Sequence, residues 1–411
     1  MLTDLNYRLS CLTVYRSLLQ DPVMSALRSS LENLQPTGDQ SLAASDAFHS
    51  MVHRLLQTGL SFGDHLLDLI AHDDNPFSRN CELYGLDSCS AALQQVTARD
   101  LRILQELYVN PSMAAVPEWQ ELQPLFDSQE PAGSNSLLTW LRQSGDWGQE
   151  LSSLADHYRK HSRGMISRYR ALSWEGEGLQ GLEHPDLPRM SDLIGYESQK
   201  EQILANTRQF VEGFPANNIL LYGSRGTGKS TMVKSLIHEF WDWGLRLVEV
   251  GRDQLVYLPQ LVDTLSDYRL PVIIFIDDLS FEAYETGYKG LKAVMEGSLQ
   301  RQPQHILIYA TSNRRHLVKE FFADRSGPGE EIHTQDTLQE KLSLSDRFGL
   351  TLTFPPTQQQ LYLQIVEHMV QEQGIEMDAE LLRRRALEWE RAHHGRSGRT
   401  ARQFVNSLRR L

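Results

Sequence analysis

The most constraining feature of this 411-residue chain is a glycine-rich segment between an aliphatic run and a helix-forming run. Residues 223–230 read Gly-Ser-Arg-Gly-Thr-Gly-Lys-Ser, after Asn-Ile-Leu-Leu-Tyr and at the start of a predicted helix over 229–240. The glycines let the backbone curl so that its N–H groups point inward, and the helix N-terminus adds partial positive charge. Such a loop is suited to holding phosphate groups, whereas an ordinary turn with an incidental lysine would not need the flanking strand and helix. The residues predicted to line it are Gly223, Ser224, Arg225, Gly226, Thr227, Gly228, Lys229, Ser230 and Thr231.

A dense aliphatic strand that ends in two acids is the second feature. Residues 272–276 read Val-Ile-Ile-Phe-Ile, which is typical of a central parallel strand, and Asp277 and Asp278 follow. Acids at this end of a strand lie where ligands bind in open α/β sheets, although they are also common as a simple turn. We expect Lys229 to contact the β- and γ-phosphates of a nucleotide, and Ser230 and Asp277 to hold Mg²⁺. Asp278 would polarise the attacking water.

Secondary-structure signals predict an α/β protein in four parts. Residues 1–172 show helical spacing and no recognisable chemistry, and residues 173–190 are rich in Gly, Glu and Pro, as in a linker. Strands then alternate with helices over 191–355, which predicts a parallel sheet, and 356–411 is helical. The expected strands are 219–222, 245–250, 272–276, 305–311 and 350–354.

Composition narrows the class of partner and the compartment. A net charge of −13 gives no support to nucleic acid as a partner, although a local basic patch remains possible. The three cysteines form no metal-binding pair, which favours buried thiols in a reducing compartment. No run is long enough to span a bilayer, and the N-terminus lacks the basic and apolar regions of a signal peptide. We therefore expect a cytoplasmic protein without a membrane partner.

Three polar residues further along the chain separate the classes of nucleotide-binding protein. Asn313 follows the strand 305–311, Arg347 lies in Ser-Asp-Arg-Phe, and Arg399 opens the last predicted helix. No Asn-Lys-x-Asp motif for guanine is present. Asn, Arg and Arg in this order, after a phosphate loop and an acid pair, resemble the AAA+ ATPases over residues 191–411. The same resemblance makes 356–411 a helical lid.

The AAA+ resemblance implies a role for each of these positions. Asn313 corresponds to the sensor-1 residue and Arg347 to the arginine finger. Arg399 is the better match to the sensor-2 arginine, with Arg402 as the alternative one turn later. The segment formed by Ile194, Gly195 and Tyr196 is similar to the family segment that lies against adenine.

The whole run of motifs resembles an uncharacterised bacterial AAA+ family filed as a domain of unknown function. The resemblance implies that the protein binds ATP and Mg²⁺, hydrolyses ATP to drive conformational change or remodelling of a partner, and self-associates. Residues 1–172 would then select a protein partner. Most AAA+ proteins have Asp-Glu where this chain has Asp277-Asp278. Glu282 is therefore an alternative base, and slow turnover is expected. A nucleotide-gated scaffold with little hydrolysis is the alternative function.

Overall fold

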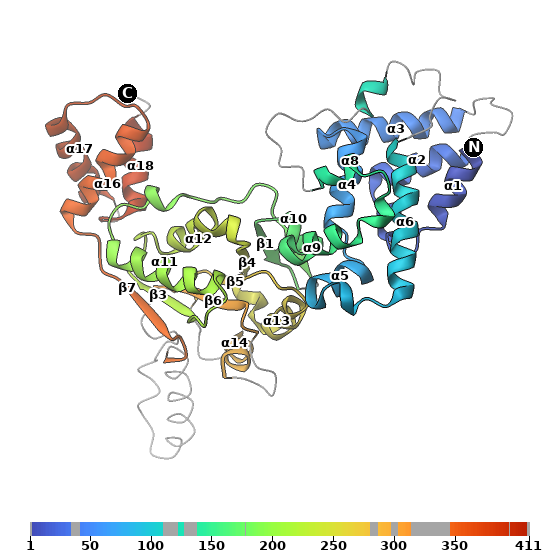
Figure 1. Cartoon of the computed structure of the whole chain (residues 1–411). Coiled ribbons are helices and arrows are strands. Elements are labelled where there is room, and N and C mark those ends of the chain that lie inside the picture. The colour runs from blue at the N-terminus through green and yellow to red at the C-terminus, as the bar shows by residue number, and fades with distance from the viewer. Residues whose placement is uncertain are drawn as a thin grey trace, which may run out of the picture. The chain divides into compact units, whose positions relative to one another are not determined.

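The computed structural model describes residues 2–33, 42–109, 122–126, 138–176, 178–279, 287–296, 303–313, 346–393 and 395–408 (Figure 1). The predicted alternative base, Glu282, lies outside these residues. The chain forms two compact units. The first comprises Met1–Arg168 and Asp267–Arg269, and the second comprises Tyr169–Ser266 and Leu270–Leu411.

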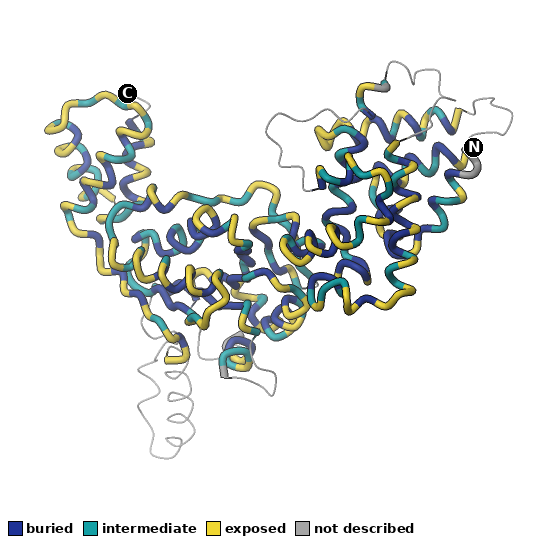
Figure 2. Tube along the Cα trace, viewed as in Figure 1, coloured by how far each residue is buried: buried dark blue, intermediate teal, exposed yellow. Residues whose placement is uncertain are grey.

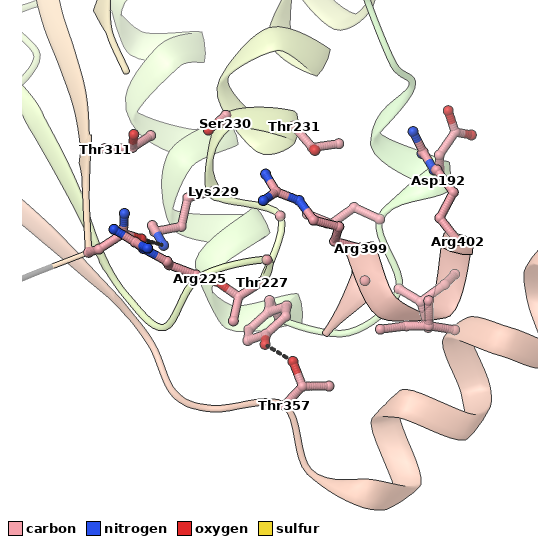
Figure 3. A pocket seen from close by; sticks show the side chains of 18 of the residues that line it. Asp192, Arg225, Thr227, Lys229, Ser230, Thr231, Thr311, Thr357, Arg399 and Arg402 are labelled. Carbon is pink, nitrogen blue, oxygen red and sulfur yellow. Dashed lines mark hydrogen bonds between the residues drawn. The ribbon is translucent and has the colours of Figure 1, made fainter. Parts of the chain in front are cut away.

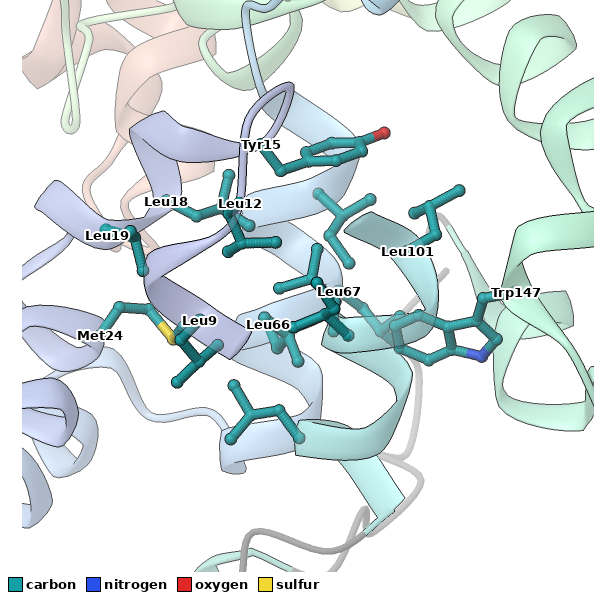
Figure 4. Packing of buried hydrophobic residues seen from close by; sticks show 14 of the residues in the cluster. Leu9, Leu12, Tyr15, Leu18, Leu19, Met24, Leu66, Leu67, Leu101 and Trp147 are labelled. Carbon is teal, nitrogen blue, oxygen red and sulfur yellow. The ribbon is translucent and has the colours of Figure 1, made fainter. Parts of the chain in front are cut away.

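The first unit is built of helices around one apolar core. In α6, Leu101, Leu104 and Leu107 recur at steps of three and are fully buried, as expected for the inner face of an amphipathic helix. Figure 4 shows Leu101 and Trp147 among the residues of this core. The α-helices are α1 (Leu2–Ser10), α2 (Pro22–Asn33), α3 (Leu42–Thr58), α4 (Phe62–His72), α5 (Pro76–Tyr84), α6 (Ala91–Val109), α8 (Thr139–Gln143), α9 (Leu151–His161) and α10 (Gly164–Arg168), and the 3-10 helices are η1 (Arg16–Gln20), η2 (Leu86–Ser88), η3 (Gln123–Leu125) and η4 (Trp147–Gln149).

The start of α5 is fixed by a capping box. Asn75 precedes the helix, and its Oδ1 accepts hydrogen bonds from the amides of Phe77 and Ser78, both at 2.9 Å. The hydroxyl of Ser78 accepts the amide of Asn75 in return. Pro76 occupies the first helical position, where its missing N–H costs nothing. This sequence therefore begins the helix at one defined residue.

A seven-stranded sheet forms the centre of the second unit in the described part of the chain. The strand order is β2-β1-β4-β5-β6-β3-β7, and every pair is parallel except β1–β2. All residues of β5 and β6 are buried, as expected for central strands covered on both faces (Figure 2). The strands are β1 (Ala171–Trp174), β2 (Leu179–Gly181), β3 (Ile219–Gly223), β4 (Arg246–Val250), β5 (Val272–Ile276), β6 (Ile306–Ser312) and β7 (Leu350–Phe354).

Helices cover this sheet and carry the connections between its strands. α11 and α12 pack against each other, and α12 contacts β4 and β6. The apolar core between them includes Ile219, Phe275 and Tyr309 from the strands. The described helices are α11 (Glu197–Val211), α12 (Lys229–Phe240), α13 (Leu258–Ser266) and α14 (Gly287–Glu296), with 3-10 helices η5 (Met190–Asp192), η6 (Trp241–Trp243) and η7 (Arg252–Tyr257).

The predicted α/β class is confirmed, but the predicted linker at 173–190 is partly strand. The five expected strands form within one residue of their predicted bounds. In addition, β1 and β2 form an antiparallel pair, and β1 extends the sheet by pairing with β4. Runs of four and three residues are too short for periodicity to be visible, and the Gly- and Glu-rich turn between them resembles a linker.

Three helices form a lid at the C-terminal end of the second unit. These are α16 (Gln359–Glu372), α17 (Ala379–Ala392) and α18 (Gly398–Leu408). Their apolar core includes Val366, Ala386 and Phe404, and Ile194 from the start of the α/β part packs against it. The segment around Ile194 therefore belongs to the same packing as the lid. None of the described helices combines the length and apolar character needed to cross a bilayer.

Candidate functional site

The glycine-rich loop connects β3 to α12 in a conformation that side chains would prevent. Gly223 has φ 143°, and a Cβ added there would lie 2.0 Å from the carbonyl oxygen of Phe354 in β7. Gly228 has φ 89°, and a Cβ there would lie 2.2 Å from Cδ1 of Leu193. Glycine is therefore required at both positions, and α12 begins at Lys229 with its N-terminus at the loop.

Lys229 is 7% exposed and reaches back across the loop. Its ammonium donates to the carbonyl oxygens of Gly223 (3.0 Å) and Ser224 (2.8 Å) and to Oδ1 of Asn313 (3.1 Å). Burial lowers the pKa of Lys229, while the carboxylates of Asp278 and Asp277 oppose this shift. The lysine is thus held beside the loop by oxygen acceptors that a phosphate oxygen could replace.

The two acids after β5 make different contacts. Oδ1 of Asp277 accepts a hydrogen bond from the hydroxyl of Ser230 at 2.6 Å. Asp278 has a left-handed backbone, with φ 51°, and its Oδ1 accepts from Nδ2 of Asn313 at 2.5 Å. Asn313 therefore joins the lysine to the second acid, and Ser230 joins the first acid to the start of α12.

These groups line a cavity of about 750 Å³ in the second unit (Figure 3). The volume falls in the range of about 300–1,000 Å³ that is usual for ligand sites. Ile194, Ile365 and Met369 supply apolar side chains to the wall, and all three belong to or pack against the apolar core of the lid. Tyr196 also lines the cavity, and its hydroxyl donates to the carbonyl oxygen of Pro355. The cavity thus combines an apolar part with a charged part.

The lid reaches this cavity through the first turns of α18. The amide of Gly398 donates to the carbonyl oxygen of Gly226 at 2.9 Å, which fastens the helix start to the phosphate loop. Figure 3 shows the side chain of Arg399 extending toward Thr231, whereas Arg402 lies on the side of Asp192. Of the two arginines, Arg399 is the one directed at the loop.

Most of the residues singled out in the sequence meet in this cavity. Those that line it are Ile194, Tyr196, Arg225, Gly226, Thr227, Gly228, Lys229, Ser230, Thr231, Asp277, Asp278, Asn313, Arg399 and Arg402. Gly223, Ser224 and Gly195 adjoin it in sequence but do not line it. Arg347 is exposed and is not part of its wall.

Sequence reasoning missed other residues of the wall, including Asp192, Thr311, Thr357, Ile365 and Met369. Thr311 could have been predicted from the sequence. It lies two positions before Asn313, and side chains two positions apart in an extended chain point to the same side. No such signal in the sequence indicates Ile365 or Met369, which lie in the lid. Their position depends on how α16 packs.

Comparison with known families identifies the chain. Residues 167–410 match the family described as "Protein of unknown function (DUF815)". The chain belongs to this family. The predicted membership of a family of unknown function is thereby confirmed, and the second unit contains the glycine-rich loop, parallel sheet and helical lid that the AAA+ resemblance implied. No curated protein matches the sequence.

Several solved structures are similar in fold to part of the chain. The Thermotoga maritima RuvB Holliday junction branch migration motor is 16% identical, with a TM-score of 0.39 over 54% of this chain and 64% of its own. The Aeropyrum pernix ORC1 protein in complex with DNA is 17% identical, with a TM-score of 0.41 over 55% and 63%. The FIGL-1 AAA domain in complex with ADP is 18% identical, with a TM-score of 0.36 over 54% and 75%. This chain thus spans less than two thirds of the RuvB chain.

Proposed function

We propose that the second unit binds ATP with Mg²⁺ and hydrolyses it to drive a conformational change in a partner. One observation carries the proposal. Lys229 and the Ser230–Asp277 pair line the same cavity, at the N-terminus of α12. A buried ammonium and a helix N-terminus together suit the charge of a triphosphate.

The donor set fits Mg²⁺ as the metal. Ser230 and Asp277 offer a hydroxyl and a carboxylate oxygen, and hard divalent cations prefer oxygen ligands. The other carboxylate oxygen of Asp277, Oδ2, accepts no hydrogen bond from the described residues, which leaves it available to a metal or its water. When bound, Mg²⁺ supplies positive charge that offsets the charge of the phosphates.

The remaining residues act through position and charge. Asp278 would accept a proton from the attacking water, and Asn313, which contacts both Lys229 and Asp278, would hold the base relative to the γ-phosphate. Arg399 would contact the phosphates from the lid. Ile194 and Tyr196, which line the wall, would border the adenine, and Gly195 joins them in the chain.

Arg347 would act on the site of a neighbouring copy. We propose self-association for this reason, since an exposed arginine outside the wall of its own site needs a second copy to take part in hydrolysis. Residues 1–172 would select a protein partner in the cytoplasm. The net charge of −13 gives nucleic acid no support as that partner.

Replacement of Lys229 by alanine tests nucleotide binding. Loss of two or more charge-assisted hydrogen bonds, at about 1.5–3 kcal/mol each, predicts an affinity for a fluorescent ATP analogue at least about 100-fold lower. Lys234→Ala is the matched control, because Lys234 lies on the same helix and its nearest acid, Glu249, is 4.0 Å away. Tight binding by Lys229→Ala in a fluorescence titration would contradict the proposal.

A nucleotide-gated scaffold with little hydrolysis is the second candidate. Two observations favour it: Asp278 replaces the longer glutamate usual at the base position, and its carboxylate is already bonded to Asn313. Phosphate release at saturating ATP separates the candidates. A wild-type rate equal to that of Asp277→Ala would support the scaffold, and a higher wild-type rate would support the ATPase.

A further inference from the structure

Thr311 lies near the carboxyl end of β6, beside the carboxyl end of β5, where both strands reach the cavity. The two strands are parallel, with Ile276 opposite Ala310, so the following residues, Asp277 and Thr311, are neighbours across the sheet. Thr311 is 2% exposed and lines the cavity. Its side chain therefore faces the acid pair from a rigid, buried strand, which is where a positioning group is most precise.

One hydroxyl of Thr311 contacts both acids. It donates its single proton to Oδ1 of Asp277 at 2.6 Å and accepts the amide of Asp278 at 2.9 Å. Ser230 donates to the same Oδ1 atom, so two hydroxyls hold one oxygen of Asp277. This arrangement fixes the rotation of the carboxylate and leaves Oδ2 without a donor among the described residues.

Thr311 also holds the turn that carries the second acid. Its carbonyl oxygen accepts the amide of Leu279 at 2.6 Å, in addition to the bond between its hydroxyl and the amide of Asp278. Asp278 between them has φ 51°, a left-handed conformation that is less favourable for aspartate than for glycine. The two bonds from one threonine therefore stabilise the backbone from which the carboxylate of Asp278 reaches Asn313.

We infer that Thr311 is a positioning residue that orients Asp277 toward Mg²⁺ and Asp278 toward Asn313. This inference rests on the proposed function, because it concerns the metal and the base of that site. Threonine and serine meet the requirement, since each supplies a hydroxyl that donates and accepts at once. Valine has nearly the same shape and supplies neither bond.

The test measures how nucleotide binding depends on Mg²⁺. A fluorescent ADP analogue is titrated against the full chain in EDTA and at increasing Mg²⁺ concentrations, which separates phosphate binding from metal binding. The Mg²⁺ midpoint is the Mg²⁺ concentration at which half of the effect on nucleotide binding is reached. Loss of a residue that hydrogen-bonds to a metal ligand typically lowers metal affinity about 10- to 100-fold. Thr311→Val should therefore raise this midpoint by about 10- to 100-fold and leave the affinity in EDTA unchanged. Thr311→Ser should restore the wild-type midpoint.

Thr207→Val is the matched control for loss of a buried hydroxyl. Thr207 is fully buried in α11. Its hydroxyl contacts the hydroxyl of Tyr309, which lies on β6, the strand that also contains Thr311. It should leave the Mg²⁺ midpoint unchanged. If Thr311→Val does not fold, Thr311→Cys replaces it, because a thiol is only a weak donor and should also raise the midpoint.

The outcomes separate this inference from the proposed function. A wild-type midpoint in Thr311→Val, or in Thr311→Cys, overturns the positioning role while nucleotide binding stands. A midpoint raised equally by Thr207→Val also overturns it, because general loss of packing would then explain the shift. A wild-type protein that binds no nucleotide, with or without Mg²⁺, overturns the proposed function and this inference together.

Discussion

Arg399 and Arg402 both reach the cavity from α18, three residues apart and thus on neighbouring parts of one helix face. They differ in direction, because Arg399 extends toward the phosphate loop and Arg402 lies on the side of Asp192 (Figure 3). A guanidinium facing a phosphate can form bidentate charge-assisted hydrogen bonds. The geometry therefore favours Arg399 as the lid residue that contacts nucleotide.

We expect Arg399→Ala to weaken binding of the ATP analogue more than Arg402→Ala does. A charge-assisted hydrogen bond contributes about 1.5–3 kcal/mol, which corresponds to roughly a 10- to 100-fold loss of affinity. Arg402→Ala should stay within about threefold of the wild type, as expected for a side chain without a phosphate contact. Fluorescence titration of both variants provides the measurement. The opposite order would assign the role to Arg402.

How well a site residue can be predicted depends on how local its constraint is. Lys229 and Ser230 follow from one continuous motif, and Asp277 follows from its place after an aliphatic strand. Thr311 contacts Asp277 only because β5 and β6 adopt one particular register. Sequence spacing predicts that Thr311 points to the same side as Asn313, which follows the strand, but it does not specify which residue of another strand they meet.

At the scale of elements, long strands were predictable and short ones were not. β5 shows a continuous apolar run of five residues, and all five are buried. β1 has four residues and β2 has three, and their hydrogen bonds depend on the edge offered by β4. Strands of this length form through pairing with a neighbour, so composition alone made the segment resemble a linker.

A capping sequence predicts where a helix begins, and α5 allows the contribution of its cap to stability to be tested. Asn75→Ala removes the acceptor for the amides of Phe77 and Ser78 and a hydrogen bond to Asp73. Loss of such a cap costs about 0.5–2 kcal/mol. Hydrogen exchange of the amides in α5 should therefore become about tenfold faster, since 1.4 kcal/mol corresponds to a factor of ten.

Asn80→Ala is the control for this substitution. Asn80 lies on the same helix and is not fully buried, and its side chain bonds locally to the carbonyl oxygen of Pro76 among the described residues. Exchange mass spectrometry of peptides covering residues 76–84 should show little change in this variant. Equal acceleration by both substitutions would contradict the assignment of the cap.

At the scale of the whole molecule, the described chain contains a nearly complete set of the groups expected for ATP hydrolysis. The cavity wall includes the cationic loop, the two acids, Asn313 and a lid arginine. Arg347 is the exception, because it is exposed and lies outside this wall. If Arg347 completes the site of another copy, hydrolysis depends on assembly, whereas binding of nucleotide does not.

We therefore expect Arg347→Ala to retain nucleotide affinity and lose turnover. An arginine supplied by a neighbour contributes about 10³- to 10⁵-fold to the rate, so the variant should release phosphate at a rate near that of Asp277→Ala. Size-exclusion chromatography with a slowly hydrolysed ATP analogue checks that it still assembles. Unchanged hydrolysis by Arg347→Ala would remove the role assigned to this arginine.

A mixture of two inactive variants distinguishes action across an interface from action within one chain. Arg347→Ala retains the phosphate loop and both acids, and Lys229→Ala retains Arg347 but should bind nucleotide only weakly. In a mixed assembly, a Lys229→Ala copy can supply its arginine to the intact site of an Arg347→Ala copy. Phosphate release should then reappear on mixing and increase with the concentration of the second variant. If Arg347 acts within its own chain, no mixture restores activity, because neither variant then contains a complete site.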